Sequence, residues 1–267
     1  MTAPHRKGPA DADGSGSPEL AIVVPLHDEA ENIGSLVDEI AAALDGRVDY
    51  EIVYVDDGSD DDTPRRLRYI AARVPRLRHV RHRRRAGQSA AIATGVRQAR
   101  APIIATLDGD GQNDPGDIVR LLSILEKAGE RDRLMVVGLR AKRQDSWLKR
   151  AASRVANAVR ARLLKDGTPD TGCGLKVFTR AAFLEMPAFD HMHRFLPALM
   201  VRQGGSVVSV PVNHRARTYG ISSYGVWDRL WVGIIDLLGV MWLQRRGSAP
   251  IIEDDDVENG GEEKKGR

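Results

Sequence analysis

The sequence predicts an α/β protein built on a mostly parallel, doubly wound sheet with helices on both faces. Short apolar runs bounded by proline, glycine or polar residues recur along the chain, and most are followed by apolar residues at helical spacing. Strand and helix that alternate in this way are typical of parallel sheets, because each parallel crossover needs a connection long enough for a helix. Acidic residues also follow several of the runs directly, at the carboxyl ends of strands where open α/β sheets bind ligands.

The first half of the chain supplies most of the predicted sheet. The run Ile103–Leu107, between Pro102 and the glycines 109 and 111, has the continuous apolar character of a buried central strand. Helical spacing follows the first strand, and Pro64 marks the first turn of a second helix. Further helices are expected to begin near residues 87 and 114. The expected strands of this half are residues 20–25, 50–55, 77–80, 103–107 and 134–139.

The second half is less regular. A long amphipathic helix is expected over residues 146–164, and residues 169–174 are expected to form a loop. A short strand over 175–178, a helical segment over 192–203 despite Pro197, a strand over 206–212 and a polar loop over 215–225 follow. The resulting division is a disordered leader (1–18), one α/β domain (19–225), a terminal helix (226–246) and a disordered acidic tail (247–267).

The segment 226–246 has an apolar core of 14 residues, Leu230–Leu243, with tryptophans and arginines at its flanks. This core is shorter than the roughly 18–20 apolar residues that span a bilayer. Its flanks suit an amphipathic helix lying in the headgroup layer as a peripheral membrane contact. A buried terminal helix or a dimer contact stays open as the alternative, so homo-oligomer formation is also left open.

The charge distribution and the cysteine content limit the classes of partner and the compartment that suit this chain. The net charge is +3, but residues 253–267 hold seven acidic and three basic residues, so the rest of the chain carries about +7. A basic body favours nucleotide phosphates or an acidic membrane surface as partners. No nucleic-acid partner is expected, because aromatic residues make up 5% of the chain and no nucleic-acid motif occurs. The single cysteine, Cys173, excludes an intrachain disulfide and fits a reducing compartment.

Acidic residues end three of the predicted strands, and parallel strands would bring these ends to one edge. Like charges gathered there repel one another, so a metal or a polar ligand must offset them. At the end of the 103–107 strand the spacing of two carboxylates and Gln112 suits Mg²⁺ or Mn²⁺ held jointly with substrate phosphates. Ordinary strand-ending turns are the alternative. The three pairs are Asp28 and Glu29, Asp56 and Asp57, and Asp108 and Asp110.

The basic run 81–85 is interpreted as a largely solvated face with one exception. Arg85 lies just before Gly87 at a predicted helix N-terminus, where anions such as nucleotide phosphates are attracted. The histidines lack the spacing of a metal set, and no local signature marks Cys173 as a thiol nucleophile.

The motifs at the strand ends resemble the signature of family-2 glycosyltransferases of the GT-A fold. They are Val24-Pro25-x-x-Asp28-Glu29-x-x-Asn32, Val55-Asp56-Asp57-Gly58-Ser59 and Asp108-Gly-Asp110-x-Gln112. Within that family the chain is most similar to the polyprenyl-phosphate glycosyltransferases, over about residues 19–246. The resemblance implies a Rossmann-like GT-A sheet. It also implies that Pro25, Glu29 and Asp57 hold the base and ribose of a nucleotide, and that Asp108, Asp110 and Gln112 hold the metal on its diphosphate.

Two further segments resemble motifs of the family, and each differs from its motif at one basic position. The loop Asp170-Thr-Gly-Cys-Gly-Leu-Lys176 resembles a family segment that usually reads Asp-x-x-Ser-Gly-Phe-Arg, with lysine here in place of arginine. The segment Arg217-x-x-Gly-x-Ser-Ser223 resembles Arg-x-x-Gly-x-Ser-Lys, with Ser223 in place of the lysine. Lys176 and Arg217 are therefore candidates for positioning an acceptor phosphate, and plain surface cations are the alternative.

Taken together, these features predict a metal-dependent transferase at the cytoplasmic face of the inner (plasma) membrane. It would move one sugar from a nucleoside-diphosphate sugar, with UDP favoured over GDP, to a polyprenyl phosphate with inversion, with Asp110, Lys176 and Arg217 as catalytic residues. The lipid-linked sugar would then serve envelope glycan synthesis or lipid modification. The alternatives are a soluble family-2 transferase with a saccharide or protein acceptor and a non-catalytic nucleotide-binding scaffold. No G-x-G-x-x-G follows the first strand, which disfavours a dinucleotide oxidoreductase.

Overall fold

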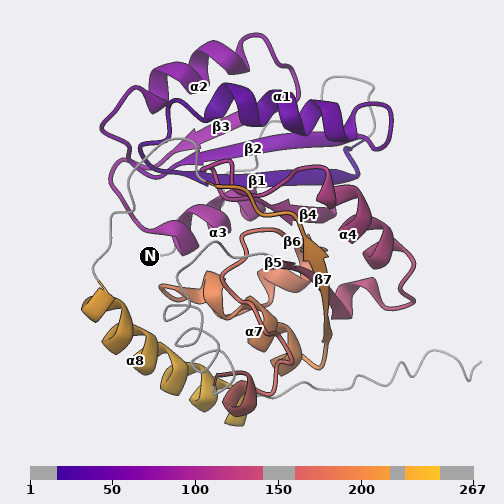
Figure 1. Cartoon of the computed structure of the whole chain (residues 1–267), viewed down its shortest axis with the longest axis vertical. Coiled ribbons are helices and arrows are strands. Elements are labelled where there is room, and N and C mark those ends of the chain that lie inside the picture. Colours follow the sequence, from indigo (N-terminus) through magenta and orange to yellow (C-terminus); the bar gives the residue numbers. More distant parts are fainter. Residues whose placement is uncertain (1–16, 141–159, 217–225, 247–267) are drawn as a thin grey trace, which may run out of the picture.

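The computed structural model describes residues 17–140, 160–216 and 226–246. Its centre is one seven-stranded sheet in the order β3-β2-β1-β4-β6-β5-β7 (Figure 1). Every strand except β6 runs in the same direction, since β6 is antiparallel to both β4 and β5. The strands are β1 (Leu20–Leu26), β2 (Tyr50–Asp56), β3 (Leu77–Arg81), β4 (Ile103–Thr106), β5 (Leu134–Arg140), β6 (Lys176–Thr179) and β7 (Ser206–Val212).

Helices cover both faces of this sheet, as the sequence predicts. One apolar cluster joins one face to α1 (Ile33–Leu44), α2 (Thr63–Ala71) and α4 (Asp117–Glu126). A second joins the other face to α3 (Gln88–Gln98), α6 (Arg180–Leu184) and α7 (Leu196–Arg202). Side chains alternate between the clusters along β1, because successive residues of a strand point to opposite faces. Two 3₁₀ turns, η1 (Arg131–Arg133) and η2 (Met192–Arg194), and α8 (Val226–Arg245) complete the described elements.

Most predicted elements agree with the structure to within a residue or two. The segment expected to be helical over 192–203 is divided into η2 and α7, because Pro197 lies in the first turn of α7 and has no N–H to continue a helix through it. The expected helix 146–164 is described only from residue 160, and residues 160–164 are helical. Most of the leader, the loop containing Arg217 and the acidic tail lie outside the described residues.

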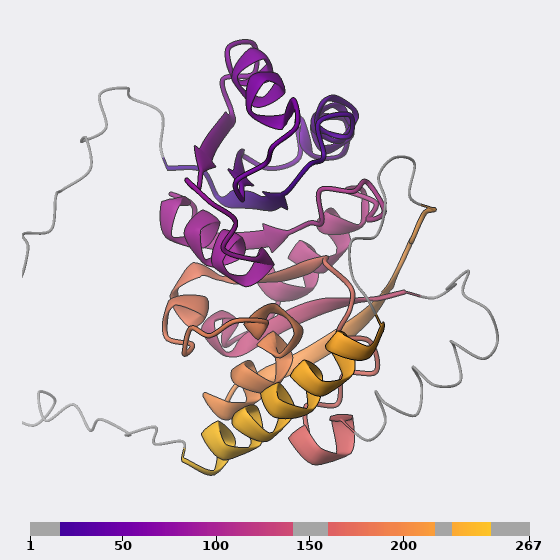
Figure 2. The ribbon, with the colours of Figure 1, turned by 90° about the vertical axis from the view of Figure 1, so that its left-hand side faces the viewer.

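The terminal helix α8 lies beside α7 (Figure 2). On its inner side Val240 is buried against Leu164, Phe195 and Ala198. At its middle, Asp236 Oδ2 lies 3.1 Å from His191 Nδ1 of the segment leading into η2. The helix is therefore docked on the domain through both apolar and polar contacts.

The outer side of α8 leaves large apolar side chains in solvent. Ile235, Leu238 and Trp242 are 67%, 60% and 60% exposed. None of the helices in the described ranges is long and apolar enough to cross a membrane. The described part of α8 is thus amphipathic with respect to the domain, with an apolar face that the described residues leave exposed.

Candidate active site

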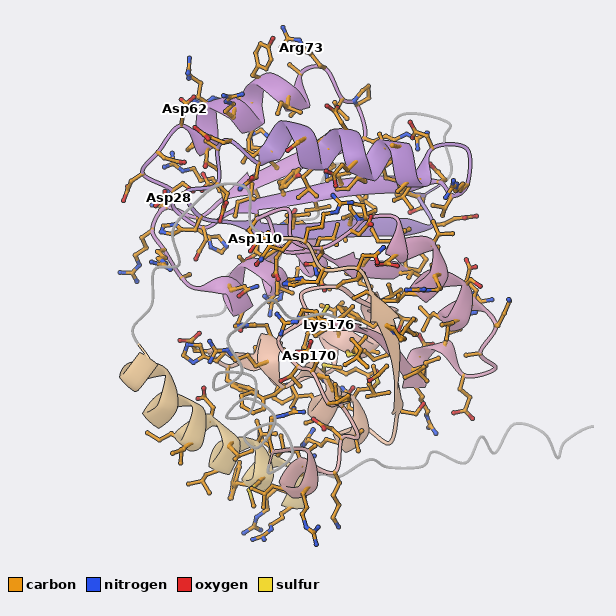
Figure 3. All side chains as sticks on the ribbon, viewed as in Figure 1. Asp28, Asp62, Arg73, Asp110, Asp170 and Lys176 are labelled. Atoms are coloured by element: carbon orange, nitrogen blue, oxygen red, sulfur yellow. The ribbon has the colours of Figure 1, made fainter. Side chains whose placement is uncertain are left out.

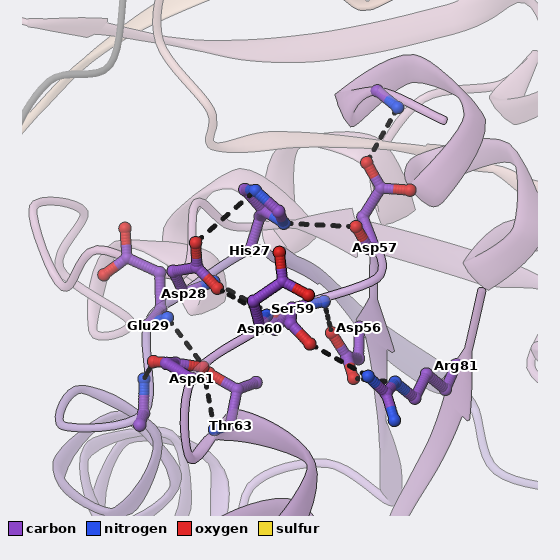
Figure 4. A network of polar contacts seen from close by, with 12 residues as sticks. His27, Asp28, Glu29, Asp56, Asp57, Ser59, Asp60, Asp61, Thr63 and Arg81 are labelled. Carbon is purple, nitrogen blue, oxygen red and sulfur yellow. Dashed lines mark hydrogen bonds and ion pairs between the residues drawn. The ribbon is translucent and has the colours of Figure 1, made fainter. Parts of the chain in front are cut away.

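The carboxyl ends of β2, β1 and β4 are neighbours in the sheet, so the three acidic turns do meet at one edge. Figure 4 shows the polar network that joins the first two turns. Asp28 donates its backbone N–H to Ser59 Oγ (3.0 Å), and its Oδ1 accepts from the N–H of Asp60 (3.0 Å). The N–H of Glu29 donates to Thr63 Oγ1 (3.1 Å). The turn after β1 and the turn after β2 are therefore held as one unit.

Asp56, at the end of β2, is fully buried and has a structural role. It accepts from the N–H of Ser59 (2.9 Å) and pairs with Arg81 Nε (3.0 Å). These contacts stabilise the tight turn after β2. The turn also needs Gly58, which has a φ of 70° and where a Cβ would lie 2.7 Å from the backbone of Arg84.

Asp57 organises the segment that leads into α3. Its carboxylate accepts hydrogen bonds from the N–H groups of Ala86 (2.8 Å) and Gly87 (2.7 Å), and it contacts His82 Nδ1 (2.7 Å). Burial disfavours the charged form, but these hydrogen bonds outweigh it and hold the pKa of Asp57 below its ordinary value. Arg81 and His82 both pair with the acids after β2, although Arg81 is exposed, as expected for most of the run 81–85, and His82 is partly buried.

Arg85, Pro25 and Glu29 surround the same edge. Arg85 is exposed two residues before Gly87, the N-cap of α3. Pro25 is the one residue of β1 that is not fully buried, and Glu29 Oε2 accepts from Asn32 Nδ2 (2.6 Å). The structure thus places these expected nucleotide contacts near the ends of β1 and β2, and their role in binding stays a prediction.

Asp108 and Asp110 lie in the turn after β4 (Figure 3 labels Asp110). Asp108 Oδ1 accepts from Gln88 Nε2 (2.8 Å), and Asp110 Oδ1 accepts from the N–H of Gln112 (3.1 Å). Burial and then the charge of Asp110 raise the pKa of Asp108 to about 6, although Lys176 and Arg140 favour its charged form. The protein therefore compensates the negative charge of Asp108 incompletely.

This donor set fits a divalent cation. In the described part of the chain, no group of three or more His, Cys, Asp or Glu side chains is placed to hold a metal. The protein would then supply two carboxylates and the side-chain carbonyl of Gln112, and phosphate oxygens and water would complete the shell, as Mg²⁺ prefers. Gln112 Nε2 donates to the backbone carbonyl of Arg215 (3.3 Å), which leaves the carbonyl oxygen of its amide as the acceptor.

The loop between Asp170 and Lys176 approaches these carboxylates from the β6 side. Arg140, the last residue of β5, forms a two-point ion pair with Asp170, with both N–O distances 2.7 Å. Burial opposes the charge of Asp170, but Arg140 outweighs it and keeps the pKa of Asp170 below its usual value. A Cβ on Gly174 would lie 2.2 Å from Asp108 Oδ2, so only glycine permits this approach. The loop therefore forms one wall beside the carboxylate of Asp108.

Two residues at the end of this loop, Cys173 and Lys176, are buried. Cys173 is buried and its pKa is raised by burial, which keeps it a thiol and agrees with its exclusion as a nucleophile. Lys176 is only 5% exposed, and its ammonium donates to the carbonyl of Cys173. Burial lowers the pKa of Lys176, and the carboxylates of Asp108 and Asp170 act against this. Lys176 is thus a buried cation near the site and not a surface one.

Contacts of Arg215 hold the turn that carries Gln112 in place. The N–H of Arg215 donates to the carbonyl of Gln112 (2.9 Å), and its guanidinium pairs with Glu39 (2.7 Å) and Asp114 (3.0 Å). Arg215 and Arg140 were not singled out by sequence. The only signal for Arg140 is its position at a strand end, while Arg215 begins a loop that had no pairing pattern.

The amino-acid sequence of the chain is similar to those of known proteins. Residues 21–186 match the model of glycosyl transferase family 2. The chain is 38% identical over 240 residues to a dodecaprenyl-phosphate galacturonate synthase of Rhizobium johnstonii, covering 87% of this chain and 69% of that protein. It is 33% identical over 210 residues to an undecaprenyl-phosphate 4-deoxy-4-formamido-L-arabinose transferase of Edwardsiella ictaluri, covering 78% of this chain and 63% of that protein.

Solved structures share the fold. A glucosyl-3-phosphoglycerate synthase of Mycobacterium tuberculosis with Mn²⁺ and UDP superposes with a TM-score of 0.63 at 20% identity, covering 88% of this chain and 81% of that one. A mannosyltransferase of Pyrobaculum calidifontis with GDP-mannose and Mn²⁺ gives 0.64 at 23% identity, covering 91% and 70%. These similarities confirm the predicted GT-A fold. Together with the family match and the named relatives, they identify the chain as a glycosyltransferase that belongs to glycosyl transferase family 2.

Proposed function

We propose that this glycosyltransferase moves one sugar from a nucleoside-diphosphate sugar to a polyprenyl phosphate. The observation that carries the proposal is Asp108, whose raised pKa shows an incompletely compensated carboxylate and which lines a cavity at the strand-end edge. The acceptor class is supported by the names of the relatives, which act on dodecaprenyl and undecaprenyl phosphates. UDP is the favoured nucleotide and inversion the favoured outcome.

Different residues would bind the metal with the donor diphosphate and the acceptor phosphate. Asp108, Asp110 and Gln112 would hold Mg²⁺ or Mn²⁺, which supplies charge stabilisation for the leaving diphosphate. The acceptor phosphate is already anionic at neutral pH, so its oxygen attacks the anomeric carbon without a strong general base. Lys176 and Arg217 would position that phosphate, and positioning can supply several kcal/mol of the barrier.

The nucleoside would lie at the ends of β1 and β2. Pro25, Glu29 and Asp57 would contact the base and ribose, and Arg85 would contact the phosphates near the N-terminus of α3. The three hydrogen bonds from residues 82–87 to Asp57 order this segment before any ligand arrives. Such preorganisation lowers the entropy that binding must overcome.

A donor screen tests the reaction. The full chain is incubated with UDP and GDP sugars and Mn²⁺, with and without a polyprenyl phosphate, and the lipid product is measured. Product that forms only with the lipid phosphate supports the proposal, while transfer to a soluble saccharide or protein contradicts it. Nucleotide binding without any transfer would favour the scaffold alternative.

The variant Asp110→Ala tests the metal assignment. We expect turnover to fall at least about 100-fold, since the variant removes a group that stabilises charge in the transition state. The matched control is Asp132→Asn, an exposed carboxylate on η1 away from the site. Near-normal turnover of Asp110→Ala in a folded protein would show that the metal is not held there.

We also propose that the outer face of α8 docks peripherally on the cytoplasmic face of the inner membrane, where a polyprenyl phosphate resides. Support comes from the exposed side chains of Leu238 and Trp242 and from the exposed Arg245 at the end of the helix. Flotation with anionic liposomes measures this binding. The double variant Leu238→Ser and Trp242→Ser should bind more than about tenfold more weakly, because each buried apolar side chain contributes roughly 1.5–3 kcal/mol.

The control for flotation is Tyr69→Ser, an apolar side chain of similar exposure on α2 (60%). It should float like the wild type. Equal flotation of the double variant and the wild type would exclude α8 as the contact.

A further inference from the structure

A cavity of about 220 Å³ begins beside Asp108. Its walls come from the start of α3, the end of β4, the loop 171–174, Lys176 at the start of β6, and η2 with the start of α7. The residues that line it within the described ranges include none from β1, β2 or the turns after them. Since the sheet order is β2-β1-β4-β6, the cavity lies on the side of Asp108 away from the acids that end β1 and β2.

This placement assigns the cavity to one part of the donor, an assignment that rests on the proposed function. With the nucleoside at the ends of β1 and β2 and the diphosphate at Asp108 and Asp110, the sugar must extend toward β6. The volume suits a single substituted ring, since an engineered cavity of about 150 Å³ already holds benzene. Gln88 and His193 also line the cavity and carry polar groups for sugar hydroxyls.

The cavity wall carries positive charge that the described residues do not neutralise by ion pairs. Lys176, 5% exposed, makes one hydrogen bond to a backbone carbonyl and forms no ion pair with any described carboxylate. The partly buried guanidinium of Arg194 likewise has no ion-pair partner among residues 17–140, 160–216 and 226–246. A buried cation without a carboxylate partner is costly unless a bound anion offsets it.

His193 lies in the same wall. Burial, followed by the charges of Lys176, Arg194 and His191, lowers the pKa of His193 to about 3, so its ring is neutral at pH 7. Its Nδ1 lies 2.7 Å from Ser89 Oγ, which fixes the ring in the cavity wall. Among the described residues that line the cavity, Asp108 is the one acidic group, and it belongs to the proposed metal site.

We infer that this cavity binds the donor sugar and selects a sugar that carries a carboxylate, with Arg194 as the residue that determines this specificity. A guanidinium can hold a carboxylate through two parallel hydrogen bonds, which gives direction as well as charge. Lys176 has the acceptor phosphate as its proposed anion, so a neutral sugar in the same position would leave Arg194 without one. The substrate class is therefore a nucleoside-diphosphate uronic acid.

Matched donors test this inference directly. UDP-galacturonate is compared with UDP-galactose, and UDP-glucuronate with UDP-glucose, using the full chain, Mn²⁺ and a polyprenyl phosphate. Each pair differs only in a C6 carboxylate against a hydroxymethyl group. We expect kcat/KM for at least one uronate to exceed that of its neutral partner by tenfold or more.

Arg194→Gln should remove this preference. The expected loss is about 10- to 100-fold in kcat/KM with the uronate donor, the usual effect of losing a hydrogen bond to a charged group, with under threefold change for the neutral donor. Arg66→Gln, a substitution of an exposed arginine on α2, is the matched control and should behave as wild type. A thermal melt confirms that each variant is folded, and Arg194→Lys, which keeps the charge without the fork, should be intermediate.

The acceptor phosphate is the other anion that these cations could hold, and the same data separate the two sources. If Arg194 holds that phosphate, Arg194→Gln lowers turnover equally with both donors and raises KM for the lipid, which overturns the inference. Donor binding measured with Mn²⁺ and without lipid must also favour the uronate in the wild type and lose that preference in Arg194→Gln. Transfer of neutral sugars at equal or higher kcat/KM overturns the uronate inference alone, whereas no transfer from any donor overturns the proposed function.

Discussion

The substitution Asp108→Asn should stabilise the ligand-free protein while it removes one ligand of the proposed metal site. Burial and the neighbouring Asp110 raise the pKa of Asp108 from 3.8 to about 6. This difference corresponds to about 3 kcal/mol at pH 7, the free energy by which ionised Asp108 destabilises the folded state. Asparagine removes the charge and keeps an oxygen that can accept from Gln88, so most of this free energy should be recovered.

The sign of the pH dependence follows from proton linkage. Between pH 3.8 and about 6 the folded protein binds more protons at Asp108 than the unfolded chain does, so the wild type loses stability from this group as pH rises. The stability difference between Asp108→Asn and wild type should therefore be near zero at pH 4. It should grow by about 1.4 kcal/mol per pH unit and level off above pH 6.

Urea unfolding followed by circular dichroism in the presence of a chelator measures this difference at pH 4.5, 5.5, 6.5 and 7.5. Asp132→Asn serves as the control, because this exposed carboxylate should give no such trend. Addition of Mn²⁺ should stabilise the wild type and not Asp108→Asn. A variant that is less stable than wild type at pH 7, or a difference that does not change with pH, would refute the electrostatic reasoning.

Three further predictions concern the walls of the site. Arg140→Ala leaves the carboxylate of Asp170 buried without its partner, so unfolding free energy should fall by about 3–5 kcal/mol in urea titrations, and a fall under 1 kcal/mol would contradict the role of this pair. Because the pKa of His193 is lowered to about 3, the free energy of unfolding should fall by about 1.4 kcal/mol per pH unit as pH falls from 6.5 toward 3. His193→Gln should remove this pH dependence of stability between pH 6 and 4.5. An unchanged pH dependence in the variant would contradict the prediction. Gly174→Ala would place a Cβ against the carboxylate of Asp108, so the Mn²⁺ concentration needed for half-maximal donor binding should rise at least about tenfold, whereas unchanged metal dependence would show that the loop can move aside.

Much of the sheet could be predicted because its signals are local. The apolar runs of β1, β2 and β4 and the helical spacing of α1 are visible within windows of a dozen residues. The convergence of three acidic turns at one edge followed from the rule for parallel strands. The reversed direction of β6 did not follow, because strand direction depends on how the chain returns to the sheet between β4 and β5.

The acidic residues of the candidate site could be predicted from the sequence, whereas most of its basic residues could not. Asp108 and Asp110 were identified because two carboxylates after a strand form a short motif. The pairing of Arg140 with Asp170 joins residues 30 positions apart, and His82 lies in a run of basic residues that was interpreted as a largely solvated face. Arg194 carries no motif, and its place in the cavity wall depends on how η2 packs against α3.

By itself the sequence determined the order of strands and helices and the strand ends at which acids occur, since period-two and 3.6-residue patterns and turn residues act over short distances. Only the tertiary structure decided which of those charges are compensated. Asp56 and Asp57 are held by Arg81 and His82, whereas Asp108 keeps a raised pKa. The physical reason is that burial and ion pairing depend on neighbours distant in the chain, and these interactions become strong only where the fold excludes water.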